Sequence, residues 1–345
     1  MEFTENEVRV RFRSNNFVPD NTGRVSIGDY TIEQIPSTDS SEAILVFEAE
    51  PGPLRKEMFF KLAKLEANYF LSFLSLISLS NCEFQAGLWN KENIVTLEGK
   101  YVLSRKPFNF EAAKEHYSRF CSLSEEQRRR FVNACKRYRQ AVSIYDKEPV
   151  VSFFLLVVAI ECLSNSMDIR ESEVAWAVYE SFYGSKFKRD RLRRIPSSVK
   201  FVEFICRYLP TGVLATEGET DLLKKRLLSA YFIRNSFVHD GEDLPSPVSM
   251  ADFVGRRSIV YTALRDDRRI EIRAPAMLWL ERIVVNVLIG YLVKESGHRM
   301  QPSAFKDLAR EAGTYAMKLR KPHPSIKKYQ DITGDFAKKY FEGDD

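Results

Sequence analysis

The stretch TDLLKKRLLSAYFIRNSFVHDG, residues 220–241, is the segment around which the rest of the chain is organised. Leucine, tyrosine, phenylalanine and valine recur along it at three- and four-residue spacing, which predicts an amphipathic helix over residues 220–238. Asp221 lies in the first turn, where the helix dipole favours a negative charge, and Gly241 followed by Pro245 marks the end. We therefore expect a helix that carries arginine, asparagine and histidine near its C-terminus.

Three polar residues near that end suit one kind of chemistry. Asn235 and His239 are four residues apart and so lie about one turn apart on the same face, while Arg234 lies roughly 140° from His239. Histidine titrates near neutral pH and moves protons. Arginine stays charged and holds a phosphate through its planar fork. This combination suits RNA cleavage in which a 2′-hydroxyl attacks its own phosphate, a reaction that requires no metal ion.

The motif and an earlier helix together resemble a known family. The form R-N-x-x-x-H at residues 234–239 resembles the HEPN ribonuclease motif. The apolar stretch VVSFFLLVVAIECLS, residues 150–164, with Glu161 near its end, resembles the second helix of the Apea-like branch of HEPN domains, and the closing V-H-D-G resembles the same branch. The resemblance covers about residues 111–295 and implies an up-down helical bundle.

The resemblance implies a metal-independent endoribonuclease that works as a homodimer, with two motif helices meeting across a two-fold axis. His239 would act as general base or acid on the 2′-hydroxyl and the leaving oxygen, and Arg234 would hold the scissile phosphate. Asn235 would orient His239 or bond the phosphate. Glu161 would either form an ion pair with Arg234 or serve as a buried carboxylate in helix packing. The family association further implies a bacterial toxin or antiphage defence effector, with tRNA or mRNA as substrate and a phage-derived or antitoxin protein as partner.

Two other functional classes compete with this interpretation. A non-catalytic HEPN module for RNA binding or protein interaction would keep the bundle and use Arg234 and His239 as structural contacts. The exposure of His239 would discriminate, since a buried histidine favours the module and one facing a basic dimer cleft favours the nuclease. A nucleotide-transfer enzyme fits less well, because the sequence has no Gly-rich phosphate loop and no clear carboxylate pair on a strand to hold magnesium.

Composition limits the remaining possibilities. The 345 residues suffice for two domains, and the net charge of +5 permits a nucleic-acid partner without requiring one. Five cysteines occur without C-x-x-C spacing, which favours reduced thiols in a cytoplasmic protein over a zinc site, so we expect neither a metal nor a cofactor. The start is acidic and polar, unlike a signal peptide, and the longest apolar segments are interrupted by charged residues before they reach membrane-spanning length.

The fold class expected from these patterns is α+β, a small N-terminal α+β module followed by an all-α HEPN-type bundle. Residues 1–105 form the module, whose role as a sensor, an RNA-positioning domain or a dimerisation element stays open. Val8, Val10 and Phe12 alternate with arginines as in a half-buried strand, and Gly28-Asp29 is typical of a hairpin turn. Further strands are expected at residues 43–48 and 89–103, with a helix at 54–78.

The helical domain is expected over residues 106–300, followed by a basic helical tail over 301–345. Its helices are predicted at residues 108–122, 124–145, 150–164, 172–183, 198–209, 220–238 and 274–295. Ser124 and Gln127 have the spacing of a capping box. The apolar stripe of the last helix is expected to pack on the motif helix, and it comprises Leu278, Ile283, Val287 and Tyr291.

The densest basic run follows the fourth of these helices. It comprises Lys186, Lys188, Arg189, Arg191, Arg193 and Arg194, with Phe187 and Leu192 interleaved. The phosphates of a substrate RNA would be its partner, because each neutralised phosphate releases counterions. A solvated loop, or one paired with acidic residues of the same chain, is the alternative.

Overall fold

The computed structural model describes residues 2–3, 7–13, 23–34, 42–48, 56–78, 83–84, 110–145, 147–184, 194–217, 220–240, 258–265 and 268–296. Of these, residues 2–3, 7, 13, 34, 42, 56–60, 78, 83–84, 216, 236–240, 258–265, 268–274 and 278 are described by their backbone alone. The predicted strand at residues 89–103 and the predicted tail at 301–345 lie outside the described residues.

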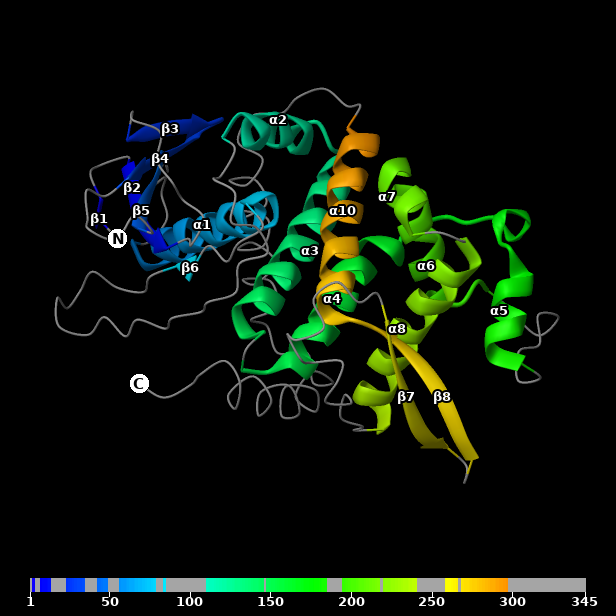
Figure 1. Ribbon diagram of the computed structural model, residues 1–345. Coiled ribbons are helices and arrows are strands. Elements are labelled where there is room, and N and C mark those ends of the chain that lie inside the picture. The colour runs from blue at the N-terminus through cyan, green and yellow to red at the C-terminus, as the bar shows by residue number, and fades with distance from the viewer. Residues whose placement is uncertain are drawn as a thin grey trace, which may run out of the picture.

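Within the described residues, the N-terminal strands form one antiparallel sheet in the order β1-β2-β5-β4-β3, with β6 paired to β2 (Figure 1). The hairpin predicted at Gly28-Asp29 is confirmed, since these two residues join β3 to β4. The register sets Val10 opposite Leu45, so that apolar positions of neighbouring strands share one buried face. The strands are β1 (Glu2–Phe3), β2 (Glu7–Arg13), β3 (Arg24–Ile27), β4 (Tyr30–Gln34), β5 (Glu42–Glu48) and β6 (Glu83–Phe84).

Two helices pack against this sheet. From β4, the ring of Tyr30 stacks on Phe70 of α1 (Lys56–Ser78) at 4.2 Å between centroids, and its hydroxyl donates to Glu66 Oε1 at 2.8 Å. Helix α2 (Phe110–Cys121) places Tyr117 directly against the hairpin turn. The N-terminal part is therefore an α+β layer, as the sequence predicted.

The remainder is mostly helical, and the predicted helices lie within a few residues of their expected positions. The short helix α7 begins directly after Pro210 and was not predicted from the sequence. The bounds are α3 (Glu125–Ile144), α4 (Pro149–Ser164), a 3-10 turn (Glu171–Glu173), α5 (Trp176–Tyr183), α6 (Ser197–Tyr208), α7 (Thr211–Thr216), α8 (Thr220–Asp240) and α10 (Met277–Glu295).

The expectation of an all-α second region was wrong. Strands β7 (Ser258–Arg265) and β8 (Arg268–Pro275) form an antiparallel hairpin, and β8 lies along α8 (Figure 1). The register sets Tyr261 opposite Ile272 and Ala263 opposite Ile270, so one face of the hairpin has an apolar sequence. The many arginines of this segment had obscured its two-residue alternation. Strand β8 is therefore one of the elements that pack on the motif helix.

The expected packing of the last helix was also wrong. Ala274 and Pro275 belong to β8, so α10 begins at Met277, later than predicted. Its main helical neighbours are α4 and α6, not the motif helix. The ring of Tyr291, for example, stacks on Phe131 of α3 at 6.2 Å between centroids. The motif helix is instead enclosed by α4, α5, α6 and β8.

A single apolar core extends through the described residues, from Val8 in the sheet to Leu292 in α10. The division predicted at residue 105 falls between α1 and α2, in residues that are not described. Across that division, α1 packs on α3, where Arg139 Nη2 donates to Asn68 Oδ1 at 3.1 Å. The sheet and the bundle therefore share one buried core.

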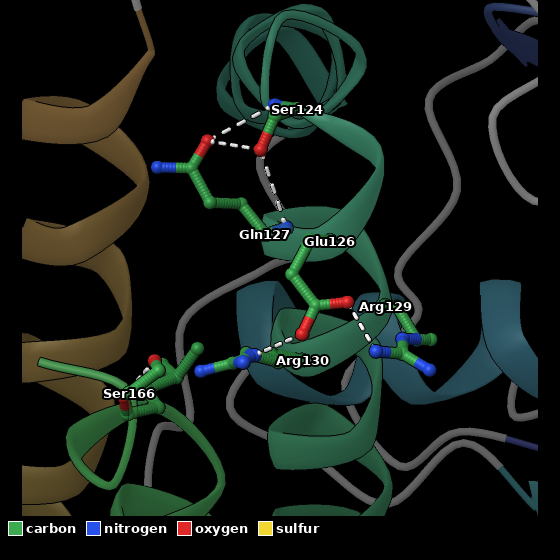
Figure 2. Close-up of polar contacts among 7 residues, drawn as sticks. Ser124, Glu126, Gln127, Arg129, Arg130 and Ser166 are labelled. Carbon is green, nitrogen blue, oxygen red and sulfur yellow. Dashed lines mark hydrogen bonds and ion pairs between the residues drawn. The ribbon is translucent and has the colours of Figure 1, made fainter.

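The predicted capping box at the start of α3 is confirmed (Figure 2). The Gln127 backbone N–H donates to Ser124 Oγ at 3.4 Å, and the Ser124 backbone N–H donates to Gln127 Oε1 at 3.0 Å. Gln127 also donates through Nε2 to Glu295 Oε2 at 2.9 Å, which links this cap to the end of α10. Glu126, beside the cap, pairs with both Arg129 and Arg130.

Loss of this cap is expected to destabilise the protein modestly. Ser124→Ala removes the side-chain acceptor of the Gln127 N–H and is expected to lower the free energy of unfolding by about 1 kcal/mol. Urea denaturation measures this change. Ser143→Ala is the matched control, because its hydroxyl only donates to the Gln140 carbonyl within the same helix. An equal loss in both variants would contradict a capping role.

Candidate functional site

The motif residues lie on the last turns of α8. The helix continues to Asp240, two residues beyond its predicted end, so Arg234, Asn235 and His239 all belong to it. Asn235 and His239 are therefore about one turn apart, and Arg234 is roughly 140° around the axis from His239. The side chain of His239 lies outside the described part of the chain. The same therefore holds for its exposure to solvent, the property that would distinguish a nuclease from a non-catalytic module.

The ion pair predicted between Arg234 and Glu161 is present. Arg234 Nη2 lies 3.0 Å from Glu161 Oε2, and only 20% of the arginine side chain and 9% of the glutamate side chain are exposed. Glu161 is supplied by α4, which packs against α8. A charged pair this far from water needs close partners, since an unpaired charge there would cost several kcal/mol.

Aromatic rings and an amide complete the surroundings of the guanidinium. Its carbon lies 5.4 Å from the ring centroid of Phe154 and 5.9 Å from that of Tyr231, within the range of cation–π attraction. Nη1 donates to Asn235 Oδ1 at 2.9 Å. That bond leaves the Asn235 amide nitrogen as the donor for a further partner. Arg234 Nε is buried and has no hydrogen-bond partner among the described residues.

The hydroxyl of Tyr231 joins this group of side chains. Its pKa responds to Glu161 and to Ser197, the first residue of α6, so both residues lie near it. Burial, and then the negative charge of Glu161, raise the pKa of Tyr231 to about 12. The hydroxyl therefore stays protonated across the neutral range.

Phe154, Ser197 and Tyr231 were missed in the sequence. A periodicity signal for two of them existed, because Tyr231 precedes Arg234 by three residues and Phe154 precedes Glu161 by seven, which places each pair on one helix face. Aromatic residues at such spacing are usually core residues, so the pattern did not distinguish them. Ser197 carried no sequence signal, since its position near Tyr231 depends on how α6 packs on α8.

The basic run is described only at its end. Arg194 is exposed, whereas Lys186, Lys188, Arg189, Arg191 and Arg193 lie outside the described residues. Three residues after Arg194 the chain reaches Ser197, which lies near enough to Tyr231 to influence the pKa of its hydroxyl. The chain thus leads from the basic run directly to the group of side chains around Arg234.

Other site types find little support in the described residues. No group of three or more histidine, cysteine, aspartate or glutamate side chains is arranged there to hold a metal ion. The cysteines described are free thiols, with Cys121 and Cys135 buried and Cys162 and Cys206 half-buried. None of the helices in the described ranges is both long enough and apolar enough to span a bilayer.

Comparison with known proteins found no match to a family model, to a curated protein or to a solved structure.

Proposed function

We propose that this protein is a metal-independent endoribonuclease of the HEPN type. The observation that carries the proposal is the fixed guanidinium of Arg234. It lies at the C-terminal end of α8, bonded to Asn235, which is one helical turn from His239. A phosphate-binding arginine and a proton-transferring histidine on one helix end are what cleavage by an internal 2′-hydroxyl requires.

Each residue has a role in that reaction. Arg234 holds the scissile phosphate and offsets the charge that develops on its oxygens in the transition state. His239 takes the proton of the 2′-hydroxyl or delivers one to the departing 5′-oxygen, so that a 2′,3′-cyclic phosphate forms as the chain breaks. Asn235, whose carbonyl oxygen is occupied by Arg234, donates its amide N–H to the phosphate or to His239. Glu161 supports Arg234 through the ion pair.

The proposed assembly and context follow from the resemblance to HEPN domains. Two copies of the chain would bring two Arg234 and two His239 side chains into one cleft. Arg194 and the preceding basic run, Lys186 to Arg193, would contact the RNA backbone. The substrate would be tRNA or mRNA in the cytoplasm, and the biological role a toxin or antiphage defence effector controlled by an antitoxin or a phage-derived partner.

One observation favours the alternative of a non-catalytic HEPN RNA-binding or protein-interaction module. Arg234 already has a carboxylate partner within its own chain, so its charge is largely compensated before any phosphate arrives. An arginine satisfied in this way is also what a purely structural helix–helix contact looks like. Cleavage experiments distinguish the two functions.

Purified protein is expected to cleave total RNA or tRNA in the presence of EDTA, and Arg234→Ala and His239→Ala are each expected to abolish this cleavage. Products should carry 2′,3′-cyclic phosphate ends, which mass spectrometry of short labelled RNAs detects. Arg282→Ala, which removes an arginine of α10 outside the site, is the control and should retain activity. Cleavage that persists in both folded motif variants would exclude this site, and no cleavage by any preparation would favour the interaction module.

A further inference from the structure

Helix α4 contacts the guanidinium of Arg234 through two of its side chains. Glu161 Oε2 lies 3.0 Å from Nη2, and the ring centroid of Phe154 lies 5.4 Å from the guanidinium carbon. Phe154 precedes Glu161 by seven residues, so the two lie on the same face of α4 and about 10 Å apart along its axis. The glutamate side chain leans toward the N-terminal end of its helix, which brings the carboxylate closer to Phe154. One helix therefore holds the guanidinium at two points.

The burial of Phe154 differs from that of its neighbours in the sequence. Phe153 and Leu155 are buried in the core, whereas Phe154 is half-buried and packs against the edge of that core. Burial of apolar area alone would be served as well by leucine or valine, which recur along this helix. An aromatic ring adds what those residues lack, a negatively polarised face that attracts a cation.

The second ring near the guanidinium has a different support. Tyr231 precedes Arg234 by three residues on α8, and its ring centroid lies 5.9 Å from the guanidinium carbon. The ring of Phe201 in α6 packs against it at 5.4 Å between centroids, so Tyr231 also serves the contact between α6 and α8. Of the two rings, that of Phe154 comes from another helix than the arginine and therefore fixes the guanidinium relative to α4.

We propose that Phe154 is a positioning residue for Arg234, which holds the guanidinium through the attraction between this cation and the face of its ring. A single ion pair lets a long side chain pivot about the point of contact, whereas two contacts from one rigid helix fix both its position and its direction. The carboxylate of Glu161 is the other contact from α4. The inference rests on the proposed function, because the position of Arg234 affects a reaction only if Arg234 meets a substrate phosphate.

Exchange of Phe154 for trifluorophenylalanine tests the inference, because the fluorine atoms withdraw electrons from the ring face while the ring nearly keeps its size and shape. The kcat for a labelled RNA is expected to fall roughly fivefold or more, with KM changed less than about twofold, since a misplaced group costs mainly transition-state stabilisation. Phe154→Leu, which has no aromatic face, is expected to lower kcat roughly tenfold or more. Phe154→Tyr keeps that face and should retain kcat within about twofold.

Tyr69 provides the matched control, because its ring centroid lies 5.2 Å from Nζ of Lys136 in a contact between α1 and α3, outside the site. Tyr69→Phe and the exchange of Tyr69 for trifluorophenylalanine differ from each other only in the fluorine atoms. Their kcat values should agree within about twofold, since this cation–aromatic contact does not hold Arg234.

The outcomes separate this inference from the proposed function. A loss of kcat on fluorination that is confined to position 154, with Phe154→Tyr active, supports the inference. If the unsubstituted protein cleaves RNA and the fluorinated ring at position 154 retains kcat, Phe154 serves packing alone, and the inference is overturned while the function stands. Equal losses on fluorination at positions 154 and 69 would show a general effect on stability and would also overturn it. If the unsubstituted protein does not cleave RNA at all, the proposed function fails and the inference fails with it.

Discussion

Replacement of Glu161 by alanine is expected to lower the free energy of unfolding by about 3 kcal/mol and to reduce RNA cleavage roughly a hundredfold. The variant leaves the guanidinium of Arg234 with 80% of its side chain removed from water and without a countercharge. Urea denaturation and a cleavage assay at fixed RNA concentration measure the two effects.

Glu173→Ala provides the control for an ion pair as such. Glu173 lies 3.0 Å from Arg207, but 45% of its side chain is exposed, so its loss should cost under about 0.5 kcal/mol and leave cleavage unchanged. The double variant Glu161→Ala with Arg234→Ala should be more stable than Glu161→Ala alone, because it removes the uncompensated charge. A double variant less stable than Glu161→Ala would contradict the view that the unpaired arginine is the source of the instability.

Replacement of Gly290 by alanine is expected to lower the free energy of unfolding by about 3 kcal/mol, although alanine favours helices more than glycine does. Gly290 lies where α10 crosses α6, and a Cβ placed there would lie 1.9 Å from the carbonyl oxygen of Tyr208. The neighbouring atom belongs to the backbone, so it cannot turn aside as a side chain would. The two helices would have to separate, which weakens the packing of α10 on the bundle.

Gly212→Ala in α7 is the matched control for this substitution. A Cβ at Gly212 meets no atom within 4 Å, so the change should be neutral or stabilise by up to about 1 kcal/mol. Urea denaturation of both variants gives the comparison. Equal stability of the Gly290 and Gly212 variants would mean that α10 and α6 tolerate a wider separation than their present contact implies.

Local signals in the sequence were sufficient for most individual elements. The capping box at Ser124, the hairpin turn at Gly28-Asp29 and the motif helix were each predicted from residues within a few positions of one another. The ion pair between Glu161 and Arg234 was also expected as one of two roles for Glu161, but on the basis of the HEPN resemblance and not of any local spacing. Local backbone preferences and capping bonds act over the same short distances, which is why such elements can be read from the chain.

The sequence by itself therefore determined the described α-helices other than α7, the strands β2 to β5 and the position of the candidate motif. Only the tertiary structure decided that β8 of the hairpin packs on α8, that α10 packs on α4 and α6, and that the rings of Tyr231 and Phe154 lie against the guanidinium that pairs with Glu161. These contacts join residues from different helices. They depend on the crossing of whole elements around a shared core, which no window of a few residues specifies.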